Sequence, residues 1–276
     1  MRPRMIFEKP VITEKGIKAM LKKRRTFIAA ILSVLIILCV SALIFEIYTF
    51  LIVNEEADVD LPPTLGNFKR VRELLTDGAP KDRYSFAVVG DTRGPYLGFG
   101  TFEKIMESLK KEDLSFMVLL GDCVRRGTPY YHKYFRAEWS EELGTPFPVF
   151  YVIGNHDIDE EKFPIDEFES TYGPTIFSFK YQDDLFVFLR VLPYPYSTRE
   201  SIEYLETLLD GHRDEYNRVF AFMHAPSIVS SIHSEKQVID PQGLQATFDR
   251  LKVDYVIAGD YHGYYRRKIN DTNHIV

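Results

Sequence analysis

Short apolar runs, each followed at once by glycine or a polar side chain, recur along the chain after residue 81. Their β-branched and aromatic residues are typical of strands that are buried on both faces. Five such runs occur, at Tyr84–Val89, Phe116–Leu120, Val149–Ile153, Val219–Met223 and Val253–Ala258. We therefore predict five strands, each of which delivers a polar residue at or just beyond its carboxyl end.

Segments with helical spacing lie between these runs. Apolar residues recur three and four positions apart within 102–109, 202–209 and 244–251, which predicts packed amphipathic helices. The run Asp184–Leu192 predicts a further strand, in a second sheet, with no ligand-type residue at its end. Strands that alternate with helices indicate an α/β domain, whose function gathers at the carboxyl ends of the strands.

A long uncharged segment sets the N-terminal part apart. Phe27–Phe45 carries no charge, and apolar character resumes after Glu46 as far as Val53, which is long enough to cross a bilayer. Basic residues at 22–25 precede it and acidic residues follow. The positive-inside rule then predicts a single-pass signal anchor in the cell membrane, with a cytoplasmic N-terminus and an extracytoplasmic domain. A cleaved signal peptide is the competing interpretation, which the length of the run disfavours.

The predicted organisation follows from these features. It consists of a basic cytoplasmic segment at 1–26, a transmembrane signal anchor at 27–53, a linker at 54–81 and a catalytic domain at 82–276. From Asn54 onward the chain has 25 basic and 37 acidic side chains, a balance of −12. Such a domain repels a polyanion, so no nucleic-acid partner is expected. The two cysteines, Cys39 and Cys123, lie in different parts of the chain, and no disulfide between them is expected.

The polar residues at the strand ends are of metal-ligand type. They are Asp91, Asp122, the triplet Asn155-His156-Asp157, His224, and the pair Asp260 and His262. Because carboxyl ends of parallel strands share one edge of a sheet, we expect these side chains to meet in one crevice. Oxygen and imidazole ligands without thiolate favour Mn or Fe, with Zn as an alternative, over a structural zinc site.

The order of these motifs resembles that of the calcineurin-like metallophosphoesterase superfamily. Gly-Asp-x-x-Gly, Gly-Asp-x-Val-x-Arg-Gly, Gly-Asn-His-Asp, His-x-Pro and Gly-x-x-His follow one another from Tyr84 toward the C-terminus. The resemblance implies a two-sheet β-sandwich flanked by helices, with two divalent metal ions at one edge. Members usually continue beyond the last histidine, whereas this sequence stops at Val276, so a C-terminal truncation is one expectation.

The resemblance also implies roles for individual side chains. It implies a bridging Asp122 between two metals, a first site completed by Asp91 and His262, and a second site completed by Asn155, His224 and Asp260.

The chemistry of the reaction falls to other residues. By resemblance, His156 protonates the leaving oxygen and Asp157 orients the His156 ring, while Arg126 grips the phosphate as a planar fork. Tyr194–Tyr196 is expected to form a loop, and a place beside the substrate pocket is the alternative for it. His132, His212, His233 and His274 lie outside the motifs and are expected to be surface or packing residues.

Two positions depart from the superfamily pattern. Arg93 stands where a ligating histidine is common, and arginine cannot deprotonate to bind a metal. It is expected either to hold phosphate or to pair with a ligand carboxylate. Asp260 stands where another histidine is common, and an aspartate there is expected to ligate and to favour a hard cation.

These observations predict hydrolysis of a phosphomonoester or phosphodiester by a dinuclear metal centre outside the cytoplasmic membrane. The expected substrate is a phosphorylated small molecule or a lipid-linked phosphate. The alternative is a catalytically weak relative that binds or senses a phosphorylated ligand. Arg93 supports this alternative because the first metal site then lacks one imidazole ligand. The leaving-group acid His156 argues against it.

Overall fold

The computed structural model describes residues 14–55, 60–76, 83–93, 101–229 and 237–276. The chain divides into two compact units, Met1–Ala57 and Asp58–Val276. In the first unit, helix α1 (Glu14–Glu55) has a stretch, Met20–Phe45, that is long and apolar enough to cross a membrane. Among the described residues this is the one helix that meets that condition, which a signal anchor and a signal sequence fulfil alike.

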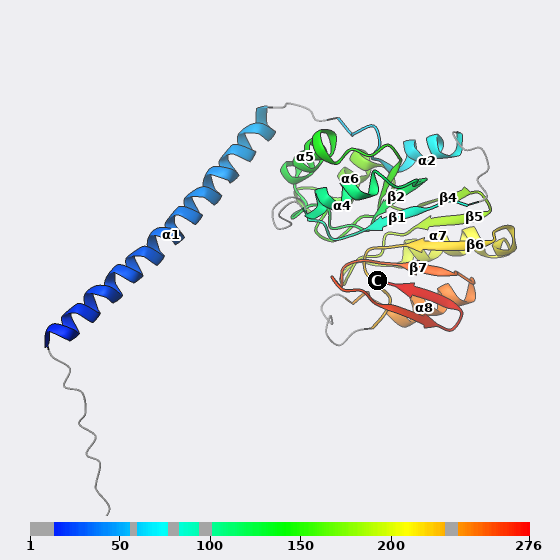
Figure 1. Ribbon diagram of the computed structural model, residues 1–276. Coiled ribbons are helices and arrows are strands. Elements are labelled where there is room, and N and C mark those ends of the chain that lie inside the picture. The colour runs from blue at the N-terminus through cyan, green and yellow to red at the C-terminus, as the bar shows by residue number, and fades with distance from the viewer. Residues whose placement is uncertain (1–13, 56–59, 77–82, 94–100, 230–236) are drawn as a thin grey trace, which may run out of the picture. The chain divides into compact units, whose positions relative to one another are not determined.

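The second unit alternates strands and helices, as Figure 1 shows. In chain order its elements are α2 (Asn67–Thr76), β1 (Phe86–Val89), α4 (Thr101–Leu109), β2 (Phe116–Leu119), α5 (Pro129–Glu138), η1 (Trp139–Leu143), β3 (Val149–Tyr151), α6 (Ile165–Tyr172), β4 (Phe177–Tyr181), β5 (Asp184–Phe188), α7 (Arg199–Leu209), η2 (Arg213–Glu215), β6 (Arg218–Phe222), α8 (Pro241–Arg250), β7 (Tyr255–Ile257), β8 (Arg266–Ile269) and β9 (Thr272–Ile275).

The strands form two sheets, which confirms the predicted fold class. The first sheet has the order β1-β2-β3 and is parallel, and the second has the order β4-β5-β6-β7-β9-β8. In the second sheet β5, β6, β7 and β9 are parallel, and β4 and β8 are antiparallel edge strands. The five runs that predict ligand-bearing strands form β1, β2, β3, β6 and β7, and the sixth run forms β5 in the second sheet.

Alternate side chains of the strands divide between two sides of each sheet. In β2, Phe116 and Val118 belong to the core between the sheets, whereas Met117 and Leu119 belong to the core under the helices of the first sheet. The core between the sheets is largely aromatic, and there the ring of Phe86 stacks on that of Phe116 with centroids 5.0 Å apart. Helices α7 and α8 contribute to a third core, on the outer face of the second sheet.

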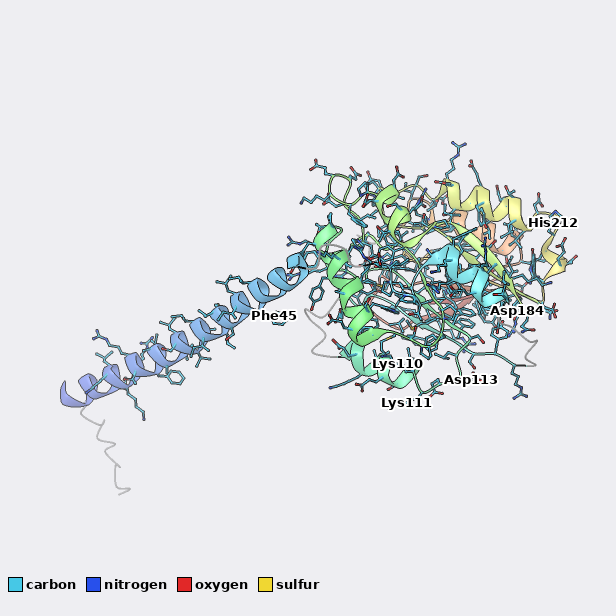
Figure 2. The ribbon with its side chains drawn as sticks, turned by 90° about the horizontal axis from the view of Figure 1, so that it is seen from above. Phe45, Lys110, Lys111, Asp113, Asp184 and His212 are labelled. Atoms are coloured by element: carbon cyan, nitrogen blue, oxygen red, sulfur yellow. The ribbon has the colours of Figure 1, made fainter. Side chains whose placement is uncertain are left out.

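A buried carboxylate joins the two sheets at the end opposite the ligand-bearing loops. Asp184, labelled in Figure 2, begins β5 and is 2% exposed. Both of its oxygens accept hydrogen bonds from Nε of Arg218 at 3.0 Å, and one accepts from the hydroxyl of Tyr84, which precedes β1. Burial, and then the negative Asp184, raise the pKa of Tyr84, so its hydroxyl stays a donor.

Part of the segment predicted as a linker is built into the domain. Leu65 is fully buried and pairs as an isolated bridge with Val149, and α2 follows directly. The side chain of Asn67 donates to the carbonyls of Tyr151 and Pro174 and accepts from the Tyr151 N–H at 2.8 Å. Asn67 thus extends the hydrogen bonding of β3, a role that a mixed polar sequence does not reveal.

We expect Asn67→Ala to lower the free energy of unfolding by about 2–3 kcal/mol, because it leaves buried backbone groups of two residues without partners. Chemical denaturation of the full chain, followed through the tyrosine and tryptophan signal, measures the change. Lys69→Ala, on an exposed part of the same helix, is the control and is expected to shift stability by less than about 0.5 kcal/mol. Equal effects of the two substitutions would mean that the hydrogen bonds of the Asn67 side chain do not stabilise the domain.

Candidate metal centre

The loops after the strands turn through an uncommon backbone conformation. Asp91, Asp122, Asp260 and His262 all have positive φ, between 50° and 65°, a region that few residues other than glycine adopt. Gly121 has φ +87°, and a Cβ there would lie 2.7 Å from Gly154. Strain of this kind gathers at functional sites, and here it turns consecutive ligand-type side chains into one crevice.

One histidine faces three oxygen atoms. His224 is fully buried, and its Nδ1 lies 2.7 Å from the carbonyl of Leu120, which can only accept, so Nδ1 carries the proton. The lone pair of Nε2 then faces Asn155 Oδ1 at 3.0 Å, Asp122 Oδ1 at 3.4 Å and Asp260 Oδ1 at 3.8 Å. Ligands about 2.1 Å from one cation lie about 3.0–3.4 Å apart, so these four atoms fit a divalent metal ion.

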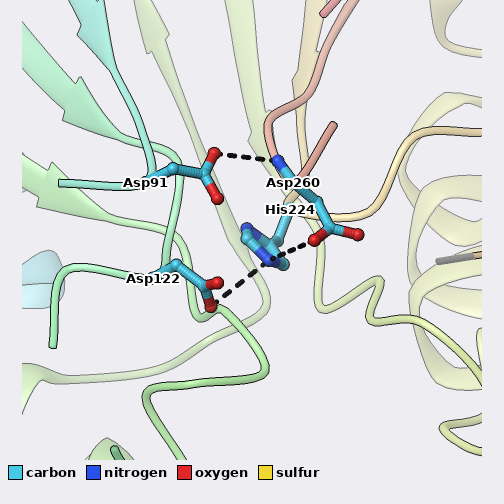
Figure 3. A group of neighbouring side chains, drawn as sticks. All are labelled: Asp91, Asp122, His224 and Asp260. Carbon is cyan, nitrogen blue, oxygen red and sulfur yellow. Dashed lines mark hydrogen bonds and ion pairs between the residues drawn. The ribbon is translucent and has the colours of Figure 1, made fainter. Parts of the chain in front are cut away.

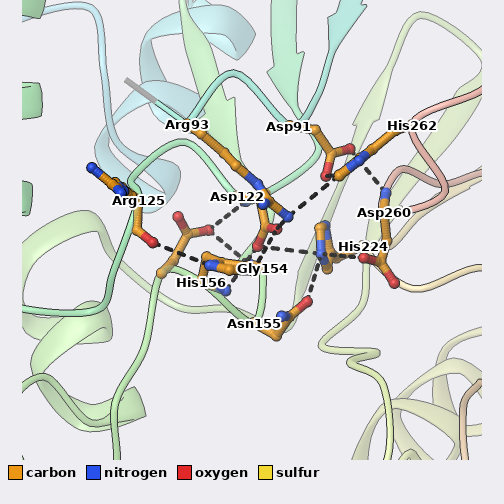
Figure 4. A network of polar contacts seen from close by, with 12 residues as sticks. Asp91, Arg93, Asp122, Arg125, Gly154, Asn155, His156, His224, Asp260 and His262 are labelled. Carbon is orange, nitrogen blue, oxygen red and sulfur yellow. Dashed lines mark hydrogen bonds and ion pairs between the residues drawn. The ribbon is translucent and has the colours of Figure 1, made fainter. Parts of the chain in front are cut away.

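The ligand-type atoms of the predicted first site adjoin those around His224. His262 Nε2 lies 3.2 Å from Asp91 Oδ1, and Asp91 Oδ2 accepts from the Asp260 N–H at 2.9 Å. Arg93 reaches between the ligand atoms of the two sites. Its Nη2 lies 3.0 Å from Asp122 Oδ2 and 3.3 Å from His262 Nε2 (Figure 4). The structure therefore brings together all six predicted ligands, and it adds a guanidinium to the first site.

The electrostatics of the cluster favour charged side chains. Ligand atoms of Asp91, Asp122, His224 and Asp260 all lie within 4.8 Å of one another (Figure 3). Burial opposes ionisation of Asp122. The attraction of His224, the hydrogen bond that Asp122 Oδ1 accepts from the His156 N–H, and the attraction of Arg93 outweigh this effect and lower the pKa of the carboxyl. Burial likewise opposes a charge on His224, but the surrounding carboxylates, Asp122 first, raise its pKa. A bound cation would replace that proton.

The carboxylate of Asp157 is the hub of two loops. It is completely buried and accepts hydrogen bonds of 2.7–3.2 Å from the loop after β2 and the end of β3. The donors are the backbone N–H groups of Asp122, Cys123, Val124 and Gly154, and the hydroxyl of Tyr151. Burial and the negative Asp122 raise the pKa of Asp157 to about 6, so the carboxyl is ionised at neutral pH.

The role predicted for Asp157 needs correction. The described contacts of its carboxylate do not include the ring of His156, whose Nδ1 lies 3.1 Å from the carbonyl of Arg125 instead. The carbonyl accepts a hydrogen bond from the Nδ1–H group, and Nε2 lies 3.9 Å from Asp122 Oδ2. A backbone carbonyl therefore orients the His156 ring, while Asp157 holds the loops that carry Asp122 and His156. All five donors fit within its reach, which leaves the carboxylate no room for the ring.

Arg126 lies apart from the cluster. Its side chain is exposed, and it lines neither of the two cavities that the described structure has beside the metal ligands. The cavity of about 390 Å³ is bordered instead by Arg93, His156, Tyr194 and Tyr196. The loop Tyr194–Tyr196 therefore borders the pocket, which is the alternative place that the sequence suggests for it. Tyr194 is 74% exposed there.

The histidines outside the motifs can be placed in part. His132 is buried, and its ring nitrogens contact the Tyr172 hydroxyl at 2.9 Å and the Asp157 carbonyl at 2.8 Å. Burial lowers the pKa of His132 to about 3, so it is a neutral packing residue that fixes the backbone at Asp157. His274 is also buried and His212 is exposed. His233 lies outside the described residues.

A family model for the calcineurin-like phosphoesterases matches residues 84–264, which is most of the second unit. The chain belongs to the calcineurin-like phosphoesterase family. Membership makes it a metal-dependent phosphoesterase by family, and its Asp/His cluster has the geometry to hold a metal ion. Among curated proteins, no match reaches significance.

Solved structures of this calcineurin-like phosphoesterase fold resemble the chain at low sequence identity. A dimetal phosphatase from Danio rerio has a TM-score of 0.58 and 14% identity, over 70% of this chain and 86% of that one. GAP50, described as the anchor in the inner membrane complex of Plasmodium, has a TM-score of 0.53 and 18% identity, over 69% and 70%. A purple acid phosphatase from yellow lupin has a TM-score of 0.50 and 16% identity, over 70% and 44%. At these identities the likeness shows the fold alone.

We expect Asp157→Asn to lower the free energy of unfolding by about 2–4 kcal/mol, because the new amide group would face donors that had an acceptor. Denaturation of the metal-free full chain measures this. Asp159→Asn, the same change two residues along, is the control. Its carboxylate accepts only two exposed turn N–H groups, so a loss below about 1 kcal/mol is expected. A silent Asp157→Asn would refute the hub.

Proposed function

We propose that the chain hydrolyses a phosphomonoester or phosphodiester with divalent metal ions held at this cluster. The observation that supports it most is the lone pair of His224 Nε2, which faces three oxygens at ligand spacing next to a cavity that His156 borders. Cation ligands and a proton donor on the wall of one pocket are the parts that phosphoester hydrolysis needs.

The residues that would hold metal follow from the geometry. We assign Asp122, Asn155, His224 and Asp260 to one ion, and Asp91 and His262, together with Asp122, to another. Because carboxylate and amide oxygens outnumber imidazoles, Mn or Fe is favoured, with Zn as the alternative. When bound, such ions polarise the phosphoryl oxygens and lower the pKa of the attacking water.

His156 is assigned the transfer of a proton to the leaving oxygen. The Arg125 carbonyl accepts from Nδ1, so the ring is fixed with Nε2 toward Asp122 and the cavity. The Nε2 proton of the imidazolium is the one that can pass to a leaving alkoxide. Asp157 acts one step away, as a positioning residue for the loops.

Of the arginines in the described part of the chain, Arg93 is the one that lines this cavity. Arg93 borders the cavity together with His156, and its guanidinium has five donors for a carboxylate or phosphate. We therefore assign the phosphate contact first to Arg93. A contact from Arg126 remains a prediction, because its exposed side chain is not among the described residues that line this cavity.

The second candidate function is binding or sensing of a phosphorylated ligand with little turnover. The contact of Arg93 with both Asp122 and His262 favours it, because it engages ligands of the first metal. Tight binding of phosphate without turnover would distinguish this function from hydrolysis.

The first experiment is turnover of phosphate esters by the full chain in detergent, after chelation and after addition of Mn²⁺. We expect hydrolysis only with metal, because the pocket relies on a cation to polarise phosphate. We further expect His156→Ala to lower kcat/KM for an alkyl phosphate by about 10²–10⁴ and much less for p-nitrophenyl phosphate, which needs no acid.

His212→Ala, which removes an exposed histidine paired with Glu215, is the matched control and should leave both rates unchanged. Hydrolysis that survives complete metal removal would overturn the proposed function. Equal losses of His156→Ala on both substrates would overturn only the proton-donor role.

We also propose that α1 is an uncleaved anchor that places the second unit outside the cytoplasmic membrane. Basic residues precede its apolar stretch and acidic residues follow it. A lipid-linked phosphate and a soluble phosphorylated molecule both remain substrates of this arrangement.

In that orientation, protease added to intact cells should degrade the domain, because it lies outside the permeability barrier, whereas a cytoplasmic domain survives until the cells are permeabilised. The mass of the purified chain tests retention of the N-terminus, and loss of the first 42 residues would show cleavage after Ala42 instead.

A further inference from the structure

The guanidinium of Arg93 competes with a metal ion for the same lone pairs. Because arginine only donates hydrogen bonds, the contact of Arg93 Nη2 with His262 Nε2 at 3.3 Å makes Nε2 the acceptor. That lone pair is the one a metal ion needs. The same Nη2 lies 3.0 Å from Asp122 Oδ2, the oxygen of Asp122 that faces away from His224.

The ligand atoms beside His224 differ from those of the first site in their relation to this guanidinium. His224 Nε2 faces oxygens of Asn155, Asp122 and Asp260, and Arg93 contacts a different oxygen of Asp122. A cation can therefore enter beside His224 without displacing the guanidinium.

The charge of the cluster points the same way. Asp91, Asp122 and Asp260 bring three negative charges within one small cluster. One divalent ion and one guanidinium neutralise them. A second divalent ion brings two further positive charges next to Arg93, which like-charge repulsion opposes.

The first site nevertheless attracts a cation. Asp91 Oδ1 is buried and accepts no hydrogen bond from the part of the chain that the structure describes, although His262 Nε2 is 3.2 Å away. An oxygen in that position is satisfied by an ion that draws Asp91, Asp122 and His262 together once the guanidinium has moved aside. The site is therefore weakened, and it is not abolished.

We propose that the two metal sites differ in affinity because the Arg93 guanidinium occupies the site that Asp91, Asp122 and His262 form. One divalent ion binds tightly beside His224. A second ion has to displace the guanidinium from Asp122 and His262, and it binds about tenfold more weakly or worse. The displaced guanidinium stays at the wall of the cavity, where a phosphate group can receive it. This inference rests on the proposed function, since it concerns the metals of that same site.

The test is metal content, which is read without any activity assay. The full chain in detergent is stripped with chelator, loaded with Mn²⁺, desalted and analysed for metal per chain. We expect one retained ion in the wild type. In Arg93→His, which exchanges the competitor for an imidazole ligand, we expect two. Calorimetric titration should show two binding steps in the wild type. The dissociation constant of the weaker step should fall about tenfold or more in Arg93→His.

Two further variants assign the ions and keep the test decisive. Arg72→His adds a histidine at an exposed position of α2 and should still retain one ion. The double variant that carries Asp91→Asn and Arg93→His should lose the ion at the Asp91 and His262 site and keep the ion beside His224. If Arg93→His does not fold, as judged by circular dichroism, Arg93→Ala replaces it, and its weaker step should again tighten.

Two ions retained equally tightly by the wild type would overturn the inference and leave the proposed function standing. A second step that does not tighten in a folded Arg93 variant would overturn it too. A wild type that binds no metal at all would instead overturn the proposed function, so the two failures are distinct.

Discussion

The mutual repulsion of three carboxylates is the constraint on which this site depends. Asp91, Asp122 and Asp260 come from three different strand ends, and their ligand atoms lie within 4.8 Å of one another and of His224. Ionised groups so close together in a buried place are stable only with compensating positive charge. The positive φ of all three aspartates shows that the backbone is strained to bring them there.

The two departures from the superfamily pattern make sense together in this light. Relative to the common histidines, Arg93 adds one positive charge and Asp260 adds one negative charge, so the total charge of the ligand set is unchanged. Both side chains border the same cavity. The pair shifts charge from one side of the centre to the other, and it makes the ligands on the His224 side richer in oxygen and those on the His262 side poorer in imidazole.

Much of the fold and of the ligand set could be predicted because each signal is local. A buried strand followed by glycine and aspartate is a pattern of a few residues, and parallel strands leave little choice of where its end lies. Long-range contacts were not predictable in this way. Asp157 takes three of its donors from residues 33 to 35 positions earlier in the chain, and the polar composition around Asn67 resembles that of a linker. β8 was not predicted because Arg266–Ile269 is charged and largely exposed, so it lacks the apolar run that indicates a strand.

The shared acceptor Asp157 has a consequence for the free energy of cation binding. Because Asp157 accepts hydrogen bonds from the loop that carries Asp122 and from the backbone beside Asn155, protein contacts hold these two loops to each other. The conformational entropy of the loops is therefore lost on folding, and a cation that binds beside His224 would not have to order them. Such a cation would stabilise the fold by mass action, so the stability of the domain would depend on the concentration of free cation.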